Sequence, residues 1–270
     1  MERREAESDG ESAEPRFRRD SEDELRERTR QLEARVEQLG AELLQARSEL
    51  DAYAFSISHD LRSPLGAILT FAAILTEDHA DRLDPQGREW LERISNSART
   101  AVSMMDSLLV FLGIGRQPMR PGPCDVEALV QEVVEELKTA DAARASVSIG
   151  SLPGCSADEA LLKALFTQLL SNALRFSARV PAPAVEIGGH ETSEQWVYFV
   201  RDNGIGFEMK HAHRLFGLFE RLHARQSGHG VGLAIAGRIV RRHGGRIWAE
   251  SEPERGATFT FTVPKTTALP

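Results

Sequence analysis

A histidine stands beside an acid in the stretch SISHDLRSPLGAIL, which begins at Ser56 and ends at Leu69. His59 follows Ile57 by two residues, a step of about 200° around an α-helix. Ile57 is the last position of an apolar seam, so we expect His59 to point away from that seam and toward solvent. An exposed imidazole beside a carboxylate is suited to act as a nucleophile, whereas a histidine of a core needs no such neighbour.

Polar side chains line one face of a predicted helix in the segment QLLSNALR. Gln168 and Asn172 are four residues apart, and Arg175 lies about one turn further along. Amide oxygens are suitable ligands for Mg²⁺, and a guanidinium is suited to phosphate. The alternative is a polar helix face that only contacts water.

The segment DNGIGF directly follows a predicted strand, WVYFVR. Asp202, at the strand end, can accept a hydrogen bond from the exocyclic amine of a base. Gly204 and Gly206 let the backbone come close to a ligand. The alternative is an ordinary turn, because Asp-Asn-Gly is typical turn chemistry.

A glycine-rich segment, GHGVGL, opens a predicted helix. Gly228, Gly230 and Gly232 are expected to present backbone N–H groups to phosphate at the helix N-terminus. The segment does not match the dinucleotide-binding fingerprint. It also has no Gly-Lys-Ser/Thr of a Walker-type loop.

The segment LFGLFERLHARQS lies between these two glycine-rich stretches. Phe216 and Phe219 have two interpretations, as anchors of a lid or as part of the core. Arg221 and Arg225 are long enough to reach a terminal phosphate.

A heptad pattern precedes the histidine motif. Its apolar residues are spaced alternately by four and three, and charged residues fill the positions between. We expect a parallel two-stranded coiled coil, and therefore a dimer. The alternative is a single amphipathic helix that packs on its own domain. The seam comprises Leu32, Val36, Leu39, Leu43, Ala46, Leu50, Tyr53 and Ile57.

Two helices are predicted around the histidine motif. The first continues to about Thr76, and the second carries an apolar pattern from Leu91 to Leu112. A polar connection, EDHADRLDP, joins them into an antiparallel hairpin, and two hairpins from a dimer make a four-helix bundle. Glycines and prolines from Gly113 to Pro123 predict a domain boundary.

The remainder predicts one mixed sheet with helices on one face. Helices are expected over 125–138, from a capping box of Ser156 and Glu159 to about 176, and over 231–243. Strands are expected near 145–149, 184–188, 196–201, 246–250 and 257–263. The predicted class is therefore α+β: a coiled coil and a two-helix hairpin, followed by an α/β sandwich. The expected bounds are 1–20 disordered, 21–54 coiled-coil linker, 55–115 hairpin and 124–265 sandwich domain.

Composition excludes some classes of protein. The net charge is −8 and no basic stripe is present, which argues against nucleic-acid binding. The longest near-apolar stretch, Leu65 to Leu75, is short of the about 20 residues of a membrane helix. The charged N-terminus MERREAESDGESAEP does not fit a secretory signal. Cys124 and Cys155 are far apart in the sequence and fit no metal spacing. We therefore expect a reducing, cytoplasmic location and no disulfide framework.

The order of these motifs resembles the sensor histidine kinases of two-component signalling, over about Leu32 to Pro264. HDLRSPL and DNGIGF…GHGVGLAI carry the resemblance. LFGLFERLH and RRHGGRIWAESEPERGATFTFTVP look most similar to the phytochrome-like group. The resemblance implies a HisKA dimerisation hairpin and a HATPase_c ATP-binding domain.

The resemblance also implies roles for the residues. His59 is the phosphate acceptor, and Asp60 is the general base that polarises its imidazole. Arg62 and Ser63 hold the site. The implied cofactors are ATP and Mg²⁺, and the implied partners are a second copy of the chain and the receiver domain of a response regulator, whose aspartate takes the phosphate. Asn172 and Gln168 are the implied Mg²⁺ ligands. The remaining nucleotide-binding residues are Arg175, Asp202 (for adenine), Gly204, Gly206, Arg221 (near the γ-phosphate), Gly228, Gly230 and Gly232.

Three positions depart from the family pattern. Gln168 stands where asparagine is usual, the lid between Phe219 and Gly228 is short, and Ser63 replaces the commoner threonine. The first two favour the alternative of a phosphatase or phosphotransfer protein of the same fold with weak kinase activity. A dimeric scaffold without chemistry and an ATPase of the gyrase or chaperone type are further alternatives, and the histidine hairpin argues against both. The input is expected through residues 1–50, a separate sensor protein or transcriptional control.

Overall fold

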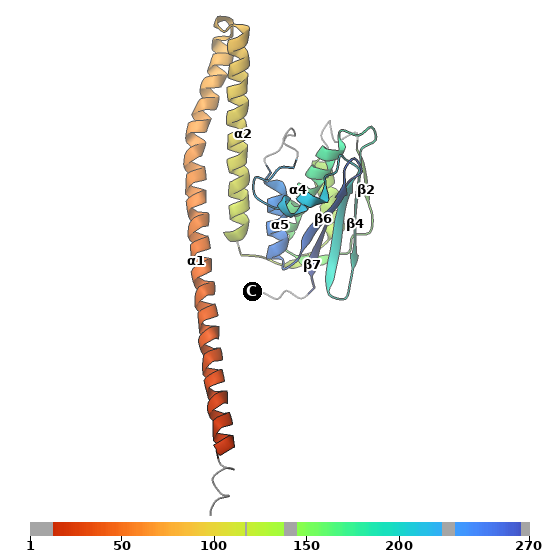
Figure 1. Cartoon of the computed structure of the whole chain (residues 1–270). Coiled ribbons are helices and arrows are strands. Elements are labelled where there is room, and N and C mark those ends of the chain that lie inside the picture. Colours follow the sequence, from red (N-terminus) through yellow and green to blue (C-terminus); the bar gives the residue numbers. More distant parts are fainter. Residues whose placement is uncertain (1–12, 117, 138–144, 223–229, 266–270) are drawn as a thin grey trace, which may run out of the picture. The chain divides into compact units, whose positions relative to one another are not determined.

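The computed structural model describes residues 13–116, 118–137, 145–222 and 230–265. The chain divides into two compact units, Met1–Ser56 and Ile57–Pro270. Figure 1 follows the chain by colour from red to blue.

One long helix, α1 (Ala13–Asp78), forms the N-terminal part of the chain. Alanine, leucine, glutamate and arginine dominate it, and these residues favour helix. The helix includes residues 13–20, so the prediction of disorder over 1–20 is wrong for that part; residues 1–12 lie outside the described residues. Pro15 is tolerated because it lies in the first turn, where its missing N–H would have no helical partner.

The heptad seam of α1 is exposed in the single chain. The exposed fraction is 61% at Leu32, 70% at Val36 and 71% at Leu43. Between the seam positions, side-chain hydrogen bonds such as Gln38 to Glu42 (2.8 Å) link residues one turn apart. The helix is therefore confirmed, whereas its pairing into a coiled coil stays a prediction.

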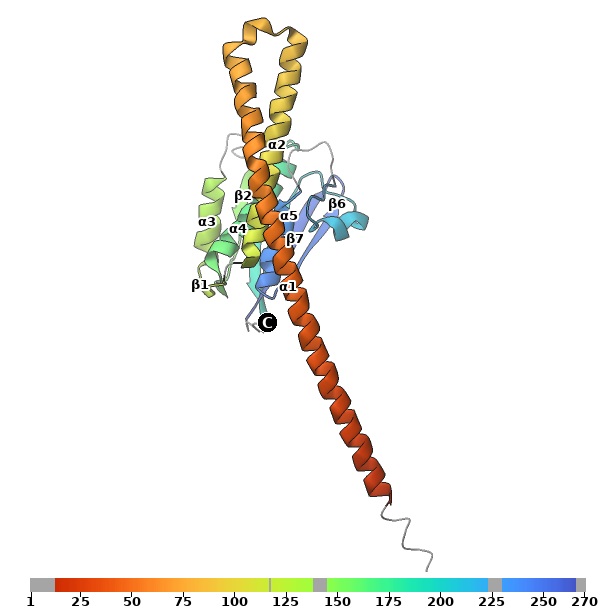
Figure 2. The same cartoon turned by 90° about the vertical axis from the view of Figure 1, so that its left-hand side faces the viewer.

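The predicted hairpin consists of the C-terminal part of α1 and α2 (Pro85–Arg116), joined through the short helix η1 (Ala80–Arg82). Figure 2 shows the two helices side by side near this connection. Asp84 accepts a hydrogen bond from Gly87 N at 2.7 Å, and Pro85 opens the helix with its fixed φ. The helix continues through Gly113 and Gly115, so the predicted break begins only after Arg116.

Within the described part of the chain, one helical stretch, Pro85–Gly115, is long and apolar enough to cross a membrane by length and composition. The sequence analysis did not predict this, because it considered only continuous apolar runs. In α2 the apolar residues recur at helical spacing with polar residues between them. A single stretch of this kind is weak evidence for a span, since the core helix of a bundle passes the same test.

A five-stranded sheet with strand order β2-β4-β5-β7-β6 forms the rest of the chain. Only β2 and β4 pair in parallel, and the other neighbours are antiparallel. Helices α4 and α5 lie against one face of the sheet (Figure 1), and α3 packs on α4. The predicted mixed sheet with helices on one face is therefore confirmed. The elements are α3 (Val126–Glu136), β2 (Ser146–Ile149), α4 (Glu159–Ser177), β4 (Ala184–Glu191), β5 (Gln195–Asp202), η3 (Met209–Arg214), α5 (Gly232–Arg242), β6 (Ile247–Glu252) and β7 (Gly256–Pro264).

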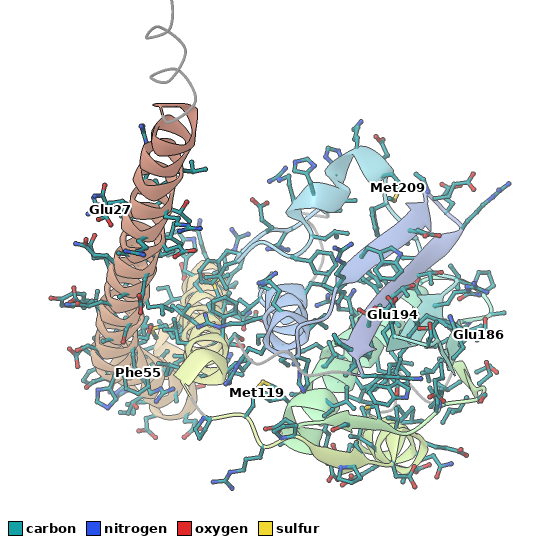
Figure 3. All side chains as sticks on the ribbon, turned by 90° about the horizontal axis from the view of Figure 1, so that it is seen from below. Glu27, Phe55, Met119, Glu186, Glu194 and Met209 are labelled. Atoms are coloured by element: carbon teal, nitrogen blue, oxygen red, sulfur yellow. The ribbon has the colours of Figure 1, made fainter. Side chains whose placement is uncertain are left out.

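The core lies between the sheet and its helices. Phe166 of α4 meets Tyr198 of β5 and Phe261 of β7 edge-on, with ring centroids 6.1 and 5.4 Å apart. On β4, Val185 and Ile187 are buried in this core, whereas Glu186 points away from the helices (Figure 3). This alternation is the period of two expected for a strand with one face covered.

A two-stranded ribbon was missed by the sequence analysis. It pairs β1 (Gly122–Cys124) with β3 (Cys155–Ala157) in antiparallel register. Strands of three residues are too short to show an alternating pattern. Ser156 lies in β3, so the predicted capping box is wrong. Asp158 caps α4 instead, by accepting from Leu161 N at 3.2 Å.

The C-terminal end of α2 contacts α5. The guanidinium of Arg238 lies over the ring of Phe111, with its carbon 4.4 Å from the ring centroid. Arg242 donates a hydrogen bond to the carbonyl oxygen of Ile114 in the last turn of α2. The Arg238 guanidinium lies directly against Gly115, so a side chain at this position would require Arg238 to move.

His243 joins the end of α5 to the beginning of α4. Its Nδ1 lies 2.9 Å from the carbonyl oxygen of Ile239, and its Nε2 accepts from Asp158 N at 3.1 Å. The ring can make both bonds only when it is neutral, with the proton on Nδ1. Burial lowers the pKa of His243, so the fold itself favours this neutral form.

Replacing His243 by alanine is expected to lower the free energy of unfolding by about 1–3 kcal/mol near neutral pH, because the buried Asp158 N–H then has no acceptor. The lowered pKa means that the folded chain binds a proton less tightly than the unfolded chain. The contribution of His243 is therefore complete above the ordinary pKa of 6.5 and is lost as the pH falls toward the folded pKa.

Urea unfolding at about pH 7.5 and about pH 5.5 checks this expectation. The difference between the wild type and His243→Ala should shrink at the lower pH. The control is His190→Ala, which removes an exposed histidine of β4. An equal difference at both pH values contradicts the prediction.

Candidate functional site

His59 lies on the exposed face of α1. The side chains of His59 and Asp60 are 71% and 75% exposed, and His59 Nδ1 is 3.4 Å from Asp60 Oδ1. The predicted exposure of the histidine is thus what the structure shows. Because the carboxylate contacts Nδ1, Nε2 is the ring nitrogen left for reaction.

The helix around His59 is joined to α2. Arg62 forms an ion pair with Asp106, which links the two helices of the hairpin about one turn from His59. Pro64 lies inside α1 and has no N–H, so the carbonyl of Asp60 receives no helical hydrogen bond from it. Ser63 is exposed beside them.

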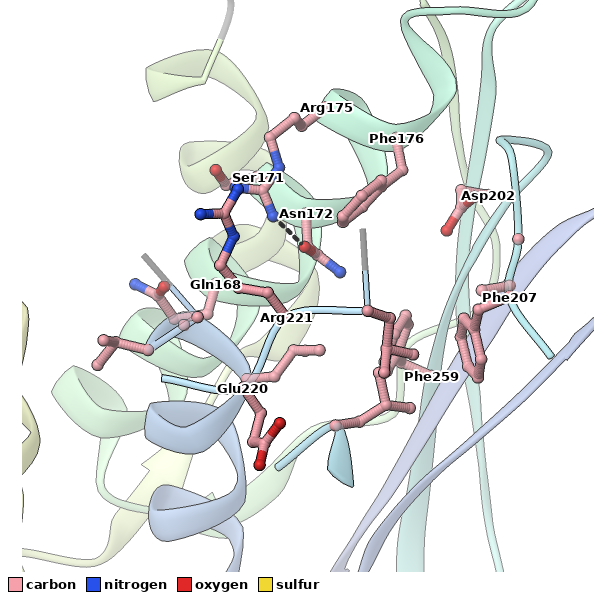
Figure 4. Close-up of a pocket in the computed structure, with 18 of the residues that line it drawn as sticks. Gln168, Ser171, Asn172, Arg175, Phe176, Asp202, Phe207, Glu220, Arg221 and Phe259 are labelled. Carbon is pink, nitrogen blue, oxygen red and sulfur yellow. Dashed lines mark hydrogen bonds between the residues drawn. The ribbon is translucent and has the colours of Figure 1, made fainter. Parts of the chain in front are cut away.

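A pocket of about 250 Å³ lies beside α4 (Figure 4). Gln168, Asn172 and Arg175 all line it, so the predicted polar helix face does bound a cavity. Asn172 is buried, and its Oδ1 accepts from Arg175 Nη2 at 2.6 Å. The amide oxygen predicted to bind Mg²⁺ is therefore held by an arginine in this structure.

Asp202 lies in the same pocket at the end of β5. Its side chain accepts from Gly204 N at 2.9 Å, and the residue is only 4% exposed. Burial raises the pKa of Asp202 to about 6, and backbone hydrogen bonds from Gly204 and Ala257 oppose that shift only in part. A buried carboxylate with a raised pKa in a cavity is typical of a binding site rather than of a turn.

Gly204 and Gly206 bring two backbone segments into close approach. A Cβ at Gly204 would lie 2.5 Å from the carbonyl oxygen of Phe176, and one at Gly206 would lie 2.1 Å from that of Glu252. Gly206 also has a φ of +59°, which side chains rarely adopt. Glycine is therefore required at both positions.

The glycine-rich segment opens α5 as predicted. Gly230 has a φ of +69°, and a Cβ there would lie 2.5 Å from the carbonyl oxygen of Glu220. Val231 is the N-cap of α5 and supplies no side-chain acceptor for the first N–H groups of the helix. Such an N-terminus favours an anion. Gly232 is the first residue of α5, whereas Gly228 lies outside the described residues.

Gln168 and Arg221 complete the polar side of the pocket. Gln168 Oε1 lies 2.7 Å from the position of a Cβ at Gly232, so this amide reaches the start of α5. Burial and the nearby charge of Arg221 lower the pKa of Arg175, which means that two guanidiniums converge here. Converging guanidiniums favour a polyanion such as a phosphate chain.

The two phenylalanines of the segment LFGLFERLHARQS, Phe216 and Phe219, have different surroundings. Phe216 packs on the core, whereas Phe219 is exposed and has a φ of +63°. Arg225 lies outside the described residues. Phe216 is therefore a core residue, and the role of Phe219 as a lid anchor stays a prediction.

The apolar floor of the pocket was missed by sequence reasoning. Phe207 and Phe259 form part of it, with ring centroids 6.5 Å apart. Phe259 alternates with threonines in the last predicted strand, which indicates a buried face, but only tertiary folding brings it to Phe207 in a loop. Among the described residues, no cluster of histidine, cysteine, aspartate and glutamate could hold a metal ion. The amide oxygens are therefore the metal donors to consider.

Two domain families match this chain. Residues 54–112 match the His Kinase A (phospho-acceptor) domain, and residues 157–267 match the histidine kinase-, DNA gyrase B-, and HSP90-like ATPase. The first match contains the His59 site and Ser107, which also lines the pocket, and the second contains Gln168, Asn172, Arg175 and Asp202.

Several relatives support these matches. The phytochrome-like protein Cph1 of Synechocystis sp. is 31% identical over 84% of this chain and 31% of its own length. The methanogenesis regulatory histidine kinase FilI of Methanothrix harundinacea is 32% identical over 89% of this chain and 26% of its own length. The chain thus spans about a third or less of these two curated relatives.

Solved structures of histidine kinases also match the fold of this chain. Full-length ShkA in complex with AMPPNP matches 80% of this chain and 46% of its own, with a TM-score of 0.59 and 26% identity. The histidine kinase AdeS of Acinetobacter baumannii shares the fold, with a TM-score of 0.55 at 20% identity over 77% of this chain and 98% of its own. The motifs, the fold and these relatives together show that the chain belongs to the sensor histidine kinases.

Proposed function

We propose that the chain is an ATP-dependent protein histidine kinase that phosphorylates its own His59 and passes the phosphate to an aspartate of a response regulator. One observation carries this proposal. A single chain combines an exposed His-Asp pair with a pocket in which a buried carboxylate, an apolar floor and converging arginines occur together. The complex of the similar protein ShkA with AMPPNP supports ATP as the ligand.

Asp202 fits the recognition of adenine. As a carboxylate it accepts a hydrogen bond from the exocyclic amine of the base, and Phe207 and Phe259 offer an apolar surface to the ring. Gly204 lets the turn after β5 pack against the Phe176 backbone at the end of α4, which holds Asp202 at the edge of the pocket.

The phosphates fit between α4 and the start of α5. Arg175 and Arg221 oppose their charge, and the N–H groups that open α5 donate to them. Asn172 and Gln168 present the amide oxygens that would hold Mg²⁺, which when bound offsets phosphate charge. Because Arg175 donates to Asn172 Oδ1, the metal would use the second lone pair of that oxygen or displace the arginine.

The chemistry at His59 follows from the ring contacts. Nε2 attacks the γ-phosphorus, the N–P bond forms, and the bond from that phosphorus to the bridging oxygen of ADP breaks. Asp60, at Nδ1, stabilises the positive charge that develops on the ring and accepts the Nδ1 proton. The aspartate of a receiver domain then attacks the same phosphorus and regenerates the imidazole.

The hairpin supports a homodimer. Phe71 of α1 and Trp90 and Ile94 of α2 are among the large apolar side chains that these two helices leave exposed in the single chain. A second hairpin would cover them in a four-helix bundle, and the exposed seam of α1 would pair alongside. We place this dimer in the cytoplasm, with its input from a separate sensor protein or from the N-terminal residues.

Incubation of the full chain with γ-labelled ATP and Mg²⁺ tests the proposal. We expect protein-bound label that is lost in acid and retained in base, as for a phosphorus–nitrogen bond. Mass spectrometry should place the label on the peptide that contains His59. If the chain binds nucleotide but takes up no label, the phosphatase or phosphotransfer alternative replaces the kinase, and the Gln168→Asn variant then shows whether the longer amide is the cause.

A further inference from the structure

Two cysteines occupy opposite positions of the small ribbon. Cys124 ends β1 and Cys155 begins β3, and the two residues are register partners in this antiparallel pair. The sequence separates them by a helix and a strand, so only the fold brings them together. Both are free thiols in this structure.

Their side chains lie on the same face of the ribbon. Register partners of an antiparallel pair point to the same side. Cys124 and Cys155 are both buried, whereas the next register pair along the ribbon, Pro123 and Ser156, is exposed on the opposite side. The two thiols therefore face one another inside the domain. The two thiols are also close enough that a negative charge on Cys155 helps to raise the pKa of Cys124.

The backbone geometry suits a disulfide. Directly opposed residues of an antiparallel pair have Cα atoms about 4.5 or 5.5 Å apart, depending on the hydrogen-bonding pattern. Disulfides join Cα atoms about 4.4–6.8 Å apart, so either pattern allows the bond without a shift of the strands.

We propose that Cys124 and Cys155 are a redox-sensitive pair that forms an intramolecular disulfide when the chain meets a low-molecular-weight disulfide. The thiolate of Cys155 attacks one sulfur of the reagent, a mixed disulfide forms, and one reagent thiolate leaves. The thiolate of Cys124 then attacks the Cys155 sulfur, the new protein bond forms, and the second reagent thiolate leaves. The two protons lost by the cysteines go to the two thiolates released.

The order of attack follows from the surroundings of the two sulfurs. Burial raises the pKa of Cys124 to about 11. Burial also raises the pKa of Cys155, whereas at Cys124 the charges of Cys155, Glu159 and Asp125 add to the effect of burial. Cys155 is thus the better first nucleophile, and the reaction is slow because both thiolates are rare near neutral pH.

The disulfide would restrain the connection that leads from α2 into the sandwich domain. β1 follows directly on the connection from α2, and Arg120 N of that connection already donates to Asp158 Oδ2 at 2.9 Å. Asp158 caps α4, the helix that carries Gln168, Asn172 and Arg175. Oxidation would add a covalent tie between this connection and the start of the pocket helix, and it would close a loop that contains α3 and β2.

The test is incubation of the full chain with 2-hydroxyethyl disulfide at mildly alkaline pH, followed by intact mass spectrometry and thermal unfolding. We expect a mass lower by two hydrogen atoms, a Cys124–Cys155 cross-linked peptide, and a midpoint raised by about 5 °C that dithiothreitol reverses. Cys124→Ala and Cys155→Ala should each abolish the loss of two hydrogen atoms, the cross-linked peptide and the shift of the midpoint, and Cys124→Ala should retain the reagent as a mixed disulfide on Cys155.

Three results would overturn the proposal. They are an unchanged mass with both thiols still open to alkylation after denaturation, a mixed disulfide that persists in the wild type, and a cross-link between two chains. Each can be told apart from a failure of the kinase proposal, because none of the readouts involves ATP or His59. Refolding from urea in the same reagent repeats the test with full access to the thiols, and absence of the cross-linked peptide there also contradicts it.

Discussion

Replacing His59 by glutamine is expected to abolish phosphate incorporation from ATP while nucleotide binding stays within about twofold of the wild type. Glutamine has no nitrogen that can attack phosphorus, so the loss should reach the detection limit. Binding should persist because His59 is not among the residues that line the pocket. Label transfer and the affinity for a fluorescent ATP analogue, measured on the same preparation, separate the two effects.

The matched control is His79→Gln, which removes another histidine of the same hairpin, at the N-cap of η1. This variant should keep the wild-type rate of labelling. Label that persists in His59→Gln with the same acid lability would show that another histidine is the acceptor. A loss in both variants would indicate damage to the hairpin rather than loss of a nucleophile, and circular dichroism of the helices would confirm that.

Replacing Asp202 by asparagine is expected to change affinity and stability in opposite directions. Affinity for ATP should fall by about 100-fold or more, because the amide no longer offers a charged acceptor to the exocyclic amine. The empty protein should become more stable above pH 6. Raising the pKa of Asp202 from its ordinary 3.8 to about 6 implies a penalty of about 3 kcal/mol for the ionised group, which asparagine removes.

The sign of the pH dependence makes the Asp202 prediction specific. A raised folded pKa means that the folded chain binds the proton more tightly, so the penalty is absent below pH 3.8 and grows as the pH rises through 6. Urea unfolding at several pH values should show the stability gain of the variant vanish in acid. ATP affinity of the wild type should itself weaken below about pH 6, as Asp202 takes up a proton.

Glu250→Gln is the control for Asp202, since it neutralises an exposed carboxylate on β6, the edge strand of the same sheet. It should change neither ATP affinity nor the pH profile. A variant Asp202→Asn that is less stable than the wild type at pH 8 would contradict the role assigned to the buried charge. Unchanged ATP affinity would contradict the proposed contact with adenine.

The helices and strands that have a repeating apolar pattern could be predicted from the sequence. The helix that carries His59, the helix face with Gln168 and Asn172, and the strand that ends at Asp202 all have repeating or flanking patterns that local physics explains. Element ends moved by a few residues because glycine does not always end a helix: α2 continues past Gly113 while its side chains still find contacts.

The features that sequence reasoning missed depend on contacts between distant segments. Cys124 and Cys155 are adjacent only because β1 and β3 pair. Phe207 and Phe259 meet only because β7 lies beside β5, whose end leads into the loop with Phe207. The hydrogen bond from Arg175 to Asn172 was within reach of the sequence, since three residues separate them on one helix, but its competition with a metal is visible only in the structure.

The contact between α2 and α5 has a consequence for the proposed transfer of phosphate from bound ATP to His59. Arg238 over Phe111 and Arg242 on the Ile114 carbonyl are interactions worth about 1 kcal/mol each, and water can replace both. Each interaction alone therefore favours the packed arrangement of α2 and α5 over a separated one by only about fivefold. Because α5 begins at the turn proposed to bind phosphate and carries Arg238 and Arg242 near its end, this one helix connects the proposed ligand site to the contact with α2.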